Sequence, residues 1–182
     1  DDVLDRFYQT AKPENPDYVV RLTSDCPLID PTIIDETIQY AIDGDYDYVH
    51  TDSICFPDGL DTEVFKFSAL ERAWKEAGMT SEREHVTPYI WKNGSAYGGD
   101  KFKSANLQNS LGVYPAKDYR ITIDEPEDFE VIKTLIEHIG IEKTWKEYID
   151  YYESHEEVRN LNSKFGYNEG YDKSIKNDKK IK

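Results

Sequence analysis

Residues 18–34 decide the fold class, and they read YVVRLTSDCPLIDPTII. Residues 18–22 form a short run rich in apolar and β-branched side chains, which is typical of a buried strand. Asp30 and Pro31 then provide a cap and a first-turn proline, so a helix is expected to follow and to end near Gly44. A strand followed at once by a helix is how a wound α/β sheet begins.

The same alternation of short apolar runs and amphipathic segments continues along the chain. Short connections between such elements favour a mostly parallel sheet with helices on both faces. In sheets of this kind, ligands bind beyond the carboxyl ends of the strands. Residues 93–116 interrupt the pattern with a loop-rich stretch and an edge strand near Phe102. The other expected strands are residues 46–50, 62–67 and 119–123, and the other expected helices are residues 1–12, 68–77, 126–139 and those that begin near 81 and 144.

Three of the expected helices begin with the spacing of a capping box, in which a hydroxyl residue is followed three positions later by Glu. Each pair is expected to satisfy free backbone N–H groups of the first helical turn. The pairs are Ser68 with Glu71, Ser81 with Glu84, and Thr144 with Glu147.

Composition limits the classes of function. The chain has 182 residues, with 37 acidic against 22 basic side chains and a formal charge of −15. Proteins that bind DNA, RNA or anionic membranes need a basic surface, so these partners are poor candidates. The two cysteines form neither a disulfide framework nor a zinc site, and no apolar run reaches the ~18 residues of a membrane span. We expect a soluble, cytoplasmic domain over residues 1–160 and a basic tail over residues 161–182.

Two aspartates follow predicted strands at positions where ligands bind. Asp25 comes after residues 18–22, and Asp124 comes after residues 119–123. Both are expected at the same rim of the sheet, where two carboxylates can hold a hard cation that also binds substrate phosphates. Mg²⁺ is the natural choice. The alternative is that Asp25 belongs to a turn and Asp124 helps to cap the next helix, with no metal.

Residues 57–63, which read PDGLDTE, offer further polar side chains at the start of a strand. Asp58 and Gly59 form a turn signal, so backbone geometry alone explains them. Asp61 and Glu63 are two residues apart and project from one face of a strand, which makes them candidates to accept hydrogen bonds from sugar hydroxyls. The alternative for both is a solvated edge.

Arg83 and His85 lie near the start of the helix that is expected to begin near residue 81. Arg83 is a candidate partner for a sugar carboxylate or phosphate, and His85 is a candidate for a nearby hydrogen bond. The alternative is that Arg83 is solvated and His85 packs on the sheet. His50, at a strand end, is a weaker candidate of the same kind.

Four ordered motifs carry a resemblance to a known family. They are RLTSDCPLIDP over residues 21–31, FPDGLDTEVF over 56–65, REHVTPYI over 83–90 and IDEPEDF over 123–129. In this order they resemble the spore coat polysaccharide biosynthesis cytidylyltransferase family, which is related to the synthetases that make CMP-activated acidic sugars. The resemblance implies a three-layer nucleotide-diphospho-sugar transferase fold of the GT-A-like, Rossmann-like kind.

The resemblance also implies a reaction and a site. The reaction is transfer of a cytidylyl group from CTP to a sugar or sugar acid, with release of pyrophosphate, for surface polysaccharide or glycan biosynthesis. Asp25 and Asp124 match the aspartates that hold Mg²⁺ in the acidic-sugar synthetases. The residues within the matching motifs that become candidates for substrate binding are Arg21, Asp61, Glu63, Arg83 and His85.

Members of this family begin with a strand and a loop rich in Gly, Arg and Lys that wraps the triphosphate. The first helix here matches the interior of the family's sequence, so we expect the fold of this chain to be N-terminally incomplete. A symmetric homodimer through residues 93–116 is the expected assembly.

Two other functions compete with cytidylyl transfer. A glycosyltransferase that uses a sugar nucleotide would need an Asp-x-Asp motif. The sequence of residues 45–47 matches this motif through Asp45 and Asp47, but their position after Gly44 favours a turn. A non-catalytic dimerisation module would use the loop-rich middle and the basic tail. Binding of nucleotide and metal separates the enzyme from the module.

Overall fold

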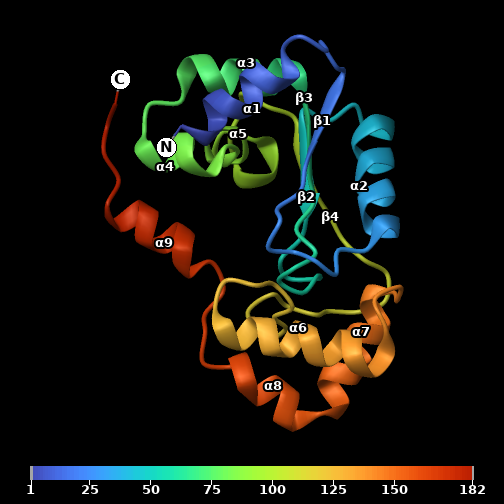
Figure 1. Ribbon diagram of the computed structural model, residues 1–182. Helices are drawn as coiled ribbons and strands as arrows, with labels where there is room; N and C mark the ends of the chain where they lie inside the picture. The colour runs from blue at the N-terminus through green and yellow to red at the C-terminus, as the bar shows by residue number, and fades with distance from the viewer. Residues whose placement is uncertain (1, 182) are drawn as a thin grey trace.

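The computed structural model describes residues 2–181, which form a four-stranded sheet with helices on both faces (Figure 1). The strands are β1 (Tyr18–Arg21), β2 (Tyr48–Thr51), β3 (Glu63–Lys66) and β4 (Ser104–Leu107), in the order β1-β3-β2-β4. β3 pairs antiparallel with β1 and with β2, whereas β2 pairs parallel with β4. Three strands therefore point the same way and β3 runs against them. This arrangement confirms the predicted α/β class.

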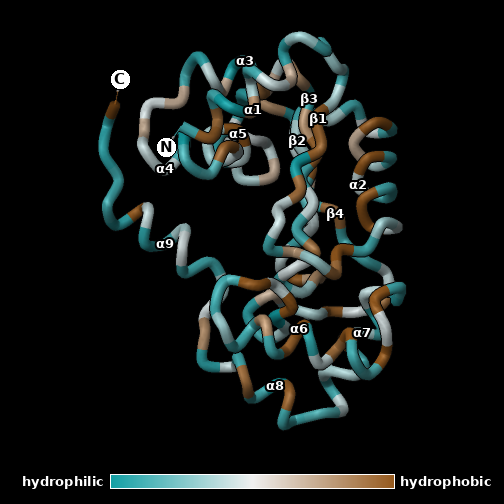
Figure 2. Tube along the Cα trace, viewed as in Figure 1, coloured by the Kyte–Doolittle hydropathy of each residue, from teal (hydrophilic) through white to brown (hydrophobic). Residues whose placement is uncertain are grey.

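Different helices cover the two faces of the sheet (Figure 1). Alternate side chains of a strand point to opposite faces. Val49 and Val64 therefore pack in one core cluster with α2, whereas Tyr48 and Phe65 pack in a second cluster on the other face. Hydrophobic segments concentrate in the sheet (Figure 2). The helix on the first face is α2 (Pro31–Asp43), and those on the second are α1 (Val3–Ala11), α3 (Phe67–Glu76), α4 (Thr80–His85) and α5 (Pro88–Lys92).

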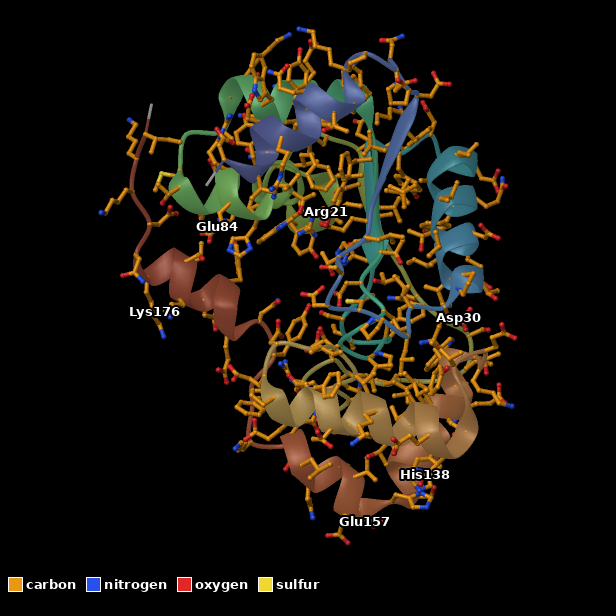
Figure 3. The ribbon with its side chains drawn as sticks, in the orientation of Figure 1. Arg21, Asp30, Glu84, His138, Glu157 and Lys176 are labelled. Atoms are coloured by element: carbon orange, nitrogen blue, oxygen red, sulfur yellow. The ribbon has the colours of Figure 1, made fainter. Side chains whose placement is uncertain are left out.

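A second group of helices lies beyond the carboxyl ends of β1, β2 and β4 (Figure 1). Asp30 ties this group to the sheet, because its carboxylate accepts from the N–H of Thr32 at 2.9 Å and from the N–H of Trp145 at 3.0 Å (Figure 3). Among residues 2–181, no helix has the length and apolar character needed to cross a membrane. The helices of this group are α6 (Pro126–Ile139), α7 (Trp145–Ser154) and α8 (Glu156–Asn162).

The C-terminal segment returns from this group to the upper part of the molecule. After α8 the chain turns and forms α9 (Glu169–Lys176), which lies against α4 (Figure 1). Residues 93–116 form loops around a short 3₁₀ helix (Ser95–Tyr97) and β4. The predicted edge strand near Phe102 is therefore present, two residues further along the chain.

Residues 119–123 do not form a strand, contrary to the prediction. Arg120 makes an isolated bridge with Asp58, and the N–H of Ile121 donates to the carbonyl of Asp58 at 2.8 Å. The N–H of Ile123 donates to the carbonyl of Asp25 at 2.8 Å. The segment is extended like a strand, but it binds two loops instead of extending the sheet.

Two of the three predicted capping boxes are also wrong. Thr144 and Glu147 cap α7 as expected. At α3 no side chain caps the first turn, because the helix already begins at Phe67. At α4 the acid that accepts from the backbone N–H groups before the helix is Glu82, at 2.9 and 3.0 Å, and not Glu84.

The carboxyl edge of the sheet gathers polar side chains from neighbouring strands. Arg21, the last residue of β1, lies opposite Glu63, the first residue of β3, and Glu63 lies opposite His50 of β2. Opposite residues in a sheet project to the same face. These three side chains therefore stand together at the edge where ligands bind in α/β sheets.

Candidate active site

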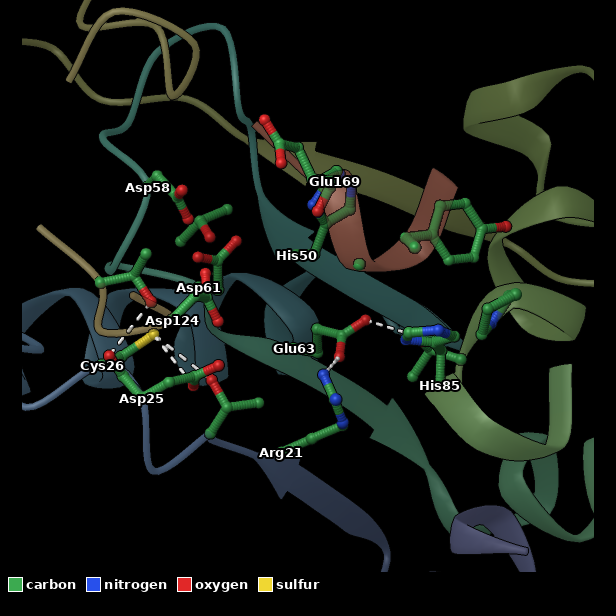
Figure 4. A pocket seen from close by; sticks show the side chains of 18 of the residues that line it. Arg21, Asp25, Cys26, His50, Asp58, Asp61, Glu63, His85, Asp124 and Glu169 are labelled. Carbon is green, nitrogen blue, oxygen red and sulfur yellow. Dashed lines mark hydrogen bonds and ion pairs between the residues drawn. The ribbon is translucent and has the colours of Figure 1, made fainter. Parts of the chain in front are cut away.

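A cavity of about 670 Å³ lies at this edge of the sheet, bounded by α4, α5 and the C-terminal segment (Figure 4). Its size is within the ~300–1,000 Å³ that is typical of small-molecule sites. The structure brings most of the predicted site residues to this one cavity. Those that line it are Arg21, Asp25, Asp61, Glu63, His85 and Asp124.

One end of the cavity, which we call the acidic end, is formed by Asp25, Asp58, Asp61 and Asp124 (Figure 4). The carbonyl oxygen of Asp25 accepts from the N–H of Ile123 at 2.8 Å and from the hydroxyl of Thr122 at 3.1 Å. Because Asp124 follows Ile123 directly, these two bonds bring it to the loop that carries Asp25. Two aspartates that are far apart in sequence are thus held at the same rim.

A single guanidinium holds the acidic end together. Arg120 donates to Asp58 at 3.0 Å, to Asp124 at 2.8 Å, and to the two carboxylate oxygens of Asp128 at 2.9 and 2.7 Å. Asp128 is fully buried and also accepts from Asn162 at 2.9 Å. Buried charges are tolerated only when they are paired and hydrogen-bonded in this way. The network fixes Asp124 and still leaves 54% of its side chain exposed.

Crowding of carboxylates changes the proton affinity of the acidic end. Burial, with repulsion from Asp61, raises the pKa of Asp58 to about 7, although Arg120 opposes the shift. Burial also raises the pKa of Asp61, whose carboxylate accepts from the N–H of Gly59 at 3.2 Å. A nearby cation favours the charged form of a carboxylate. A cation bound at the acidic end would therefore stabilise the charged form of these carboxylates.

The oxygen donors of the acidic end fit Mg²⁺ when a phosphate-bearing ligand shares the ion. Mg²⁺ is commonly bound by one or two carboxylates together with waters and substrate phosphates. Within residues 2–181, no group of three or more His, Cys, Asp or Glu side chains is arranged to hold a metal alone. A site built from Asp25 and Asp124 would therefore depend on the ligand's own oxygens.

The opposite end of the cavity, which we call the aromatic end, is built on Glu63. Its carboxylate accepts from the guanidinium of Arg21 at 2.5 Å and from the hydroxyls of Tyr48 and Thr87, both at 2.6 Å. Burial alone would raise the pKa of Glu63, but Arg21 and the two hydroxyls hold this pKa below its usual value. A carboxylate has about four acceptor positions. Glu63 therefore fixes Arg21 and keeps little capacity for a sugar hydroxyl.

Rings cover the rest of the aromatic end. Tyr171 packs edge-on against His85, with ring centroids 5.1 Å apart, and lies 6.1 Å from the ring of Trp91. The Trp91 ring lies 5.3 Å from Tyr97, whose hydroxyl is 2.8 Å from Nε2 of His50. Burial lowers the pKa of His85, which favours the neutral imidazole. The aromatic end thus offers ring faces and hydrogen-bonding groups with little net charge.

Arg83 lies outside the cavity, unlike the other predicted site residues. Its guanidinium donates to the carboxylate of Asp2 at 2.6 to 3.0 Å and to the carbonyl of Trp74 at 2.7 Å. Only 9% of its side chain is exposed. Arg83 therefore ties α4 to α1 and α3, and we leave it out of the site.

The Asp-x-Asp motif also lies away from the cavity. Asp45 and Asp47 pair with Nζ of Lys66 at 2.7 and 3.3 Å, and neither lines the cavity. Asp45 has a positive φ of 47°, as expected for a turn residue. The motif therefore belongs to the turn before β2.

Known proteins resemble this chain in sequence. The sequence model of the family described as cytidylyltransferase matches residues 1–164. The chain belongs to the cytidylyltransferase family. It is 37% identical over 163 residues to an uncharacterized protein of Methanocaldococcus jannaschii, MJ1063, covering 89% of this chain and 64% of that protein. It is 34% identical over 139 residues to the spore coat polysaccharide biosynthesis protein SpsF of Bacillus subtilis, covering 76% of this chain and 55% of SpsF.

A solved structure shares the fold of this chain. It is described as a cytidylyltransferase from Leptospira borgpetersenii serovar Hardjo-bovis, is 31% identical, and superposes with a TM-score of 0.76 over 86% of this chain and 64% of that one. The chain thus spans between 55% and 64% of the length of these relatives. The likeness confirms the predicted family and fold.

Two residues of this cavity escaped the sequence analysis. Arg120 could have been suspected, because Asp124 and Asp128 follow it at four and eight positions, but its bond to Asp58 spans 62 residues. Tyr171 lies in the basic tail. The residues around it also resemble the tail of the family, but the sequence analysis assigned them no part in the site.

Proposed function

We propose that this protein transfers a cytidylyl group from CTP to a sugar or sugar acid, with release of pyrophosphate, in a Mg²⁺-dependent reaction. The observation that supports this proposal is the division of one cavity into an acidic end and an aromatic end with little net charge. A polyphosphate with its cation suits the first, and a sugar ring suits the second.

At the acidic end, Asp25 and Asp124 would hold Mg²⁺. The bound ion would neutralise charge that develops on the phosphates and hold the α-phosphate near the acceptor. Arg120 would keep Asp124 in place through the bond at 2.8 Å. Among the described residues at this end, Arg120 is the strongly basic side chain and it is already paired with three carboxylates, so it has little capacity to neutralise a triphosphate.

At the aromatic end, the residues of the chain would bind and orient the acceptor. Glu63 holds Arg21 at 2.5 Å, so the guanidinium is fixed at the cavity wall. Asp61, although it belongs to the acidic end, would accept a hydrogen bond from a sugar hydroxyl. His85, whose neutral form is favoured by burial, would donate or accept one hydrogen bond. Catalysis would then rest mainly on positioning and electrostatics.

The names of relatives support the biological setting of this proposal. SpsF is named as a spore coat polysaccharide biosynthesis protein, and the solved structure is described as a cytidylyltransferase. A role in supplying an activated sugar for a surface polysaccharide follows by analogy. The placement of Asp45 and Asp47 away from the cavity favours nucleotidyl transfer over glycosyl transfer.

The test is an assay for cytidylylated sugar. The chain is incubated with radiolabelled CTP, Mg²⁺ and, in turn, a neutral hexose, a hexose phosphate and a sugar acid, and the products are separated by chromatography. We expect a labelled sugar product with at least one acceptor. Asp25→Asn and Asp124→Asn should each reduce the rate at least ~100-fold, because each removes a ligand of the cation.

The matched control is Asp43→Asn on α2, an exposed aspartate whose carboxylate accepts only from Gln39 among the bonds described. This variant should keep the wild-type rate. The proposal would be contradicted if no acceptor gave a labelled product, or if both Asp25→Asn and Asp124→Asn kept full activity.

A further inference from the structure

The C-terminal arm, which we define as residues 165–181, forms one wall of the cavity although it lies outside the region that matches the family. The family match ends at residue 164, whereas seven residues between 165 and 173 line the cavity. The arm leaves the group of α6, α7 and α8 and reaches α4 (Figure 1). On the way it lines the cavity. The matched region therefore does not include this wall of the cavity.

The arm is held at both ends. Just before it, Nζ of Lys164 contacts Glu127 at 2.5 Å. Near its other end, the carboxylate of Asp178 accepts from the N–H and hydroxyl of Ser81 at 2.9 and 2.7 Å and from the hydroxyl of Thr80 at 2.8 Å. Asp178 thereby caps the first turn of α4, whose N-cap residue, Met79, makes no side-chain capping bond. These contacts fix the arm against α4.

The middle of the arm is fixed on the aromatic end of the cavity. The hydroxyl of Ser174 donates to Glu84 at 3.0 Å and lies 3.0 Å from Nε2 of His85. One turn earlier on α9, the ring of Tyr171 packs against His85 and Trp91. The position of Tyr171 is therefore determined by contacts on two elements.

The hydroxyl of Tyr171 is buried and has no hydrogen-bond partner among residues 2–181. Among residues 2–181, three buried side-chain atoms have no hydrogen-bond partner. Two of them belong to Tyr171 and Thr62, which line the cavity. Buried polar groups without a partner are rare, because burial costs free energy unless a hydrogen bond replaces the lost water. Because Tyr171 also lines the cavity, a ligand bound there could supply the missing hydrogen bond.

We propose that Tyr171 binds the sugar acceptor and sets which monosaccharide the enzyme takes. Its hydroxyl forms a hydrogen bond with a sugar hydroxyl, while its ring and that of Trp91 cover the apolar face of the sugar. The proposal rests on the proposed function for the identity of the ligand as a sugar acceptor. It adds a substrate-binding residue that lies beyond the matched family region, on a segment held in place by Asp178.

The test compares Tyr171→Phe with Tyr40→Phe. The first change removes only the buried hydroxyl, and the second removes an exposed hydroxyl from α2 on the opposite face of the sheet. Binding is measured by saturation-transfer NMR, without CTP, using methyl α-D-mannopyranoside, D-glucuronate and D-mannose 1-phosphate as probes. We expect at least one probe to bind the wild-type chain, and Tyr171→Phe to weaken that binding about tenfold, the effect of one lost hydrogen bond to a buried group. Tyr40→Phe should bind as the wild type does.

A second variant tests the arm itself. Asp178→Ala removes the anchor on α4 without touching the cavity, and it should weaken binding of the same probe by about tenfold or more, because Tyr171 then loses its fixed position. The proposal is overturned if no probe binds the wild-type chain, or if Tyr171→Phe binds the probe as tightly as Tyr40→Phe. It is also overturned if, in the transfer assay, Tyr171→Phe raises the KM for CTP and leaves the KM for the acceptor unchanged, because the ring would then serve the nucleotide.

These outcomes separate this inference from the proposed function. Tyr171-dependent sugar binding without any cytidylyl transfer would retain the inference and remove the reaction. Transfer at an unchanged acceptor KM in Tyr171→Phe would retain the reaction and remove the inference.

Discussion

The acidic end and the aromatic end of the cavity are stabilised in different ways. At the acidic end, Arg120 binds three carboxylates, and two further aspartates, Asp25 and Asp61, add negative charge without a basic partner of their own in the described bonds. At the aromatic end, Glu63 and Arg21 neutralise each other and rings provide most of the surface. The contrast indicates that one end of the site is built to receive positive charge and the other to receive a polar but weakly charged group.

The largest effect is expected from breaking the network below the acidic end. Asp128 is fully buried and accepts from Arg120, from Asn162 and from the N–H groups of Asp124 and Glu125. In Asp128→Asn, an NH₂ group replaces one carboxylate oxygen and cannot accept from these donors. We therefore expect the free energy of unfolding to fall by about 3–5 kcal/mol. Urea denaturation at pH 7 measures the change.

The exposed Glu130, on the same helix as Asp128, provides the control. It pairs with Lys133 at 3.6 Å on the surface, and Glu130→Gln should change the free energy of unfolding by less than about 0.5 kcal/mol. Equal stabilities for Asp128→Asn and the wild type would show that the network does not hold the acidic end together.

The acid stability of the protein should depend on the same residue. Burial alone would raise the pKa of Asp128, but Arg120, Asn162 and backbone N–H groups hold this pKa below its usual value. A lowered pKa in the folded state gives stability above the unfolded value of ~3.9 and loses it as pH falls further. Between pH 5 and pH 2, thermal melting should show a steeper loss of stability for the wild type than for Asp128→Asn.

A smaller effect of opposite sign is expected from Asp58. Its pKa is raised to about 7, so the folded state keeps a proton that the unfolded chain has already lost. The stability that this proton provides is complete below the unfolded pKa and is lost as pH rises through about 7. From pH 5 to pH 8, the wild type should lose about 2 kcal/mol more free energy of unfolding than Asp58→Asn.

Urea denaturation at several pH values measures this difference. Asp118→Asn, at an exposed aspartate, should follow the wild-type profile. Parallel profiles for the wild type and Asp58→Asn would mean that Asp58 is not the group whose proton affinity is raised.

The smallest effect concerns the arm that closes the aromatic end. Asp178→Ala removes the cap of α4, and the loss of one capping side chain costs about 1 kcal/mol. Hydrogen exchange should show faster exchange in the arm and in the first turn of α4, with the acidic end unchanged. The exposed Asp172, on the same arm, gives Asp172→Asn as a control that should exchange as the wild type does.

Local signals in the sequence predicted the elements of the fold well. The helix from Pro126 to Ile139 was found from its first-turn proline and the glycine after its end, and α2 from Asp30 and Pro31. Residues 119–123 were misassigned, because their apolar alternation is that of a strand, whereas their partners are loops that no local pattern reveals. No local signal in the sequence predicted that β3 runs antiparallel to β1 and β2.

The sequence predicted those site residues that could be recognised from their residue type and from their position after a strand. Asp25 and Asp124 were found because both follow strand-like segments, and the sheet register places Arg21 beside Glu63. Arg83 was placed in the site because its position in a motif says nothing about which way the side chain points, and it points to Asp2. Asp58 was assigned to turn geometry alone, although it also binds Arg120.

The most direct test of the central claim is calorimetric titration of the chain with CTP, with and without Mg²⁺, in the wild type and in Asp124→Asn. The account predicts that CTP binds the wild type only when Mg²⁺ is present, and that Asp124→Asn loses this binding, because the acidic end repels phosphates unless a cation lies between them. CTP binding of equal strength with and without Mg²⁺, or unchanged in Asp124→Asn, would contradict it.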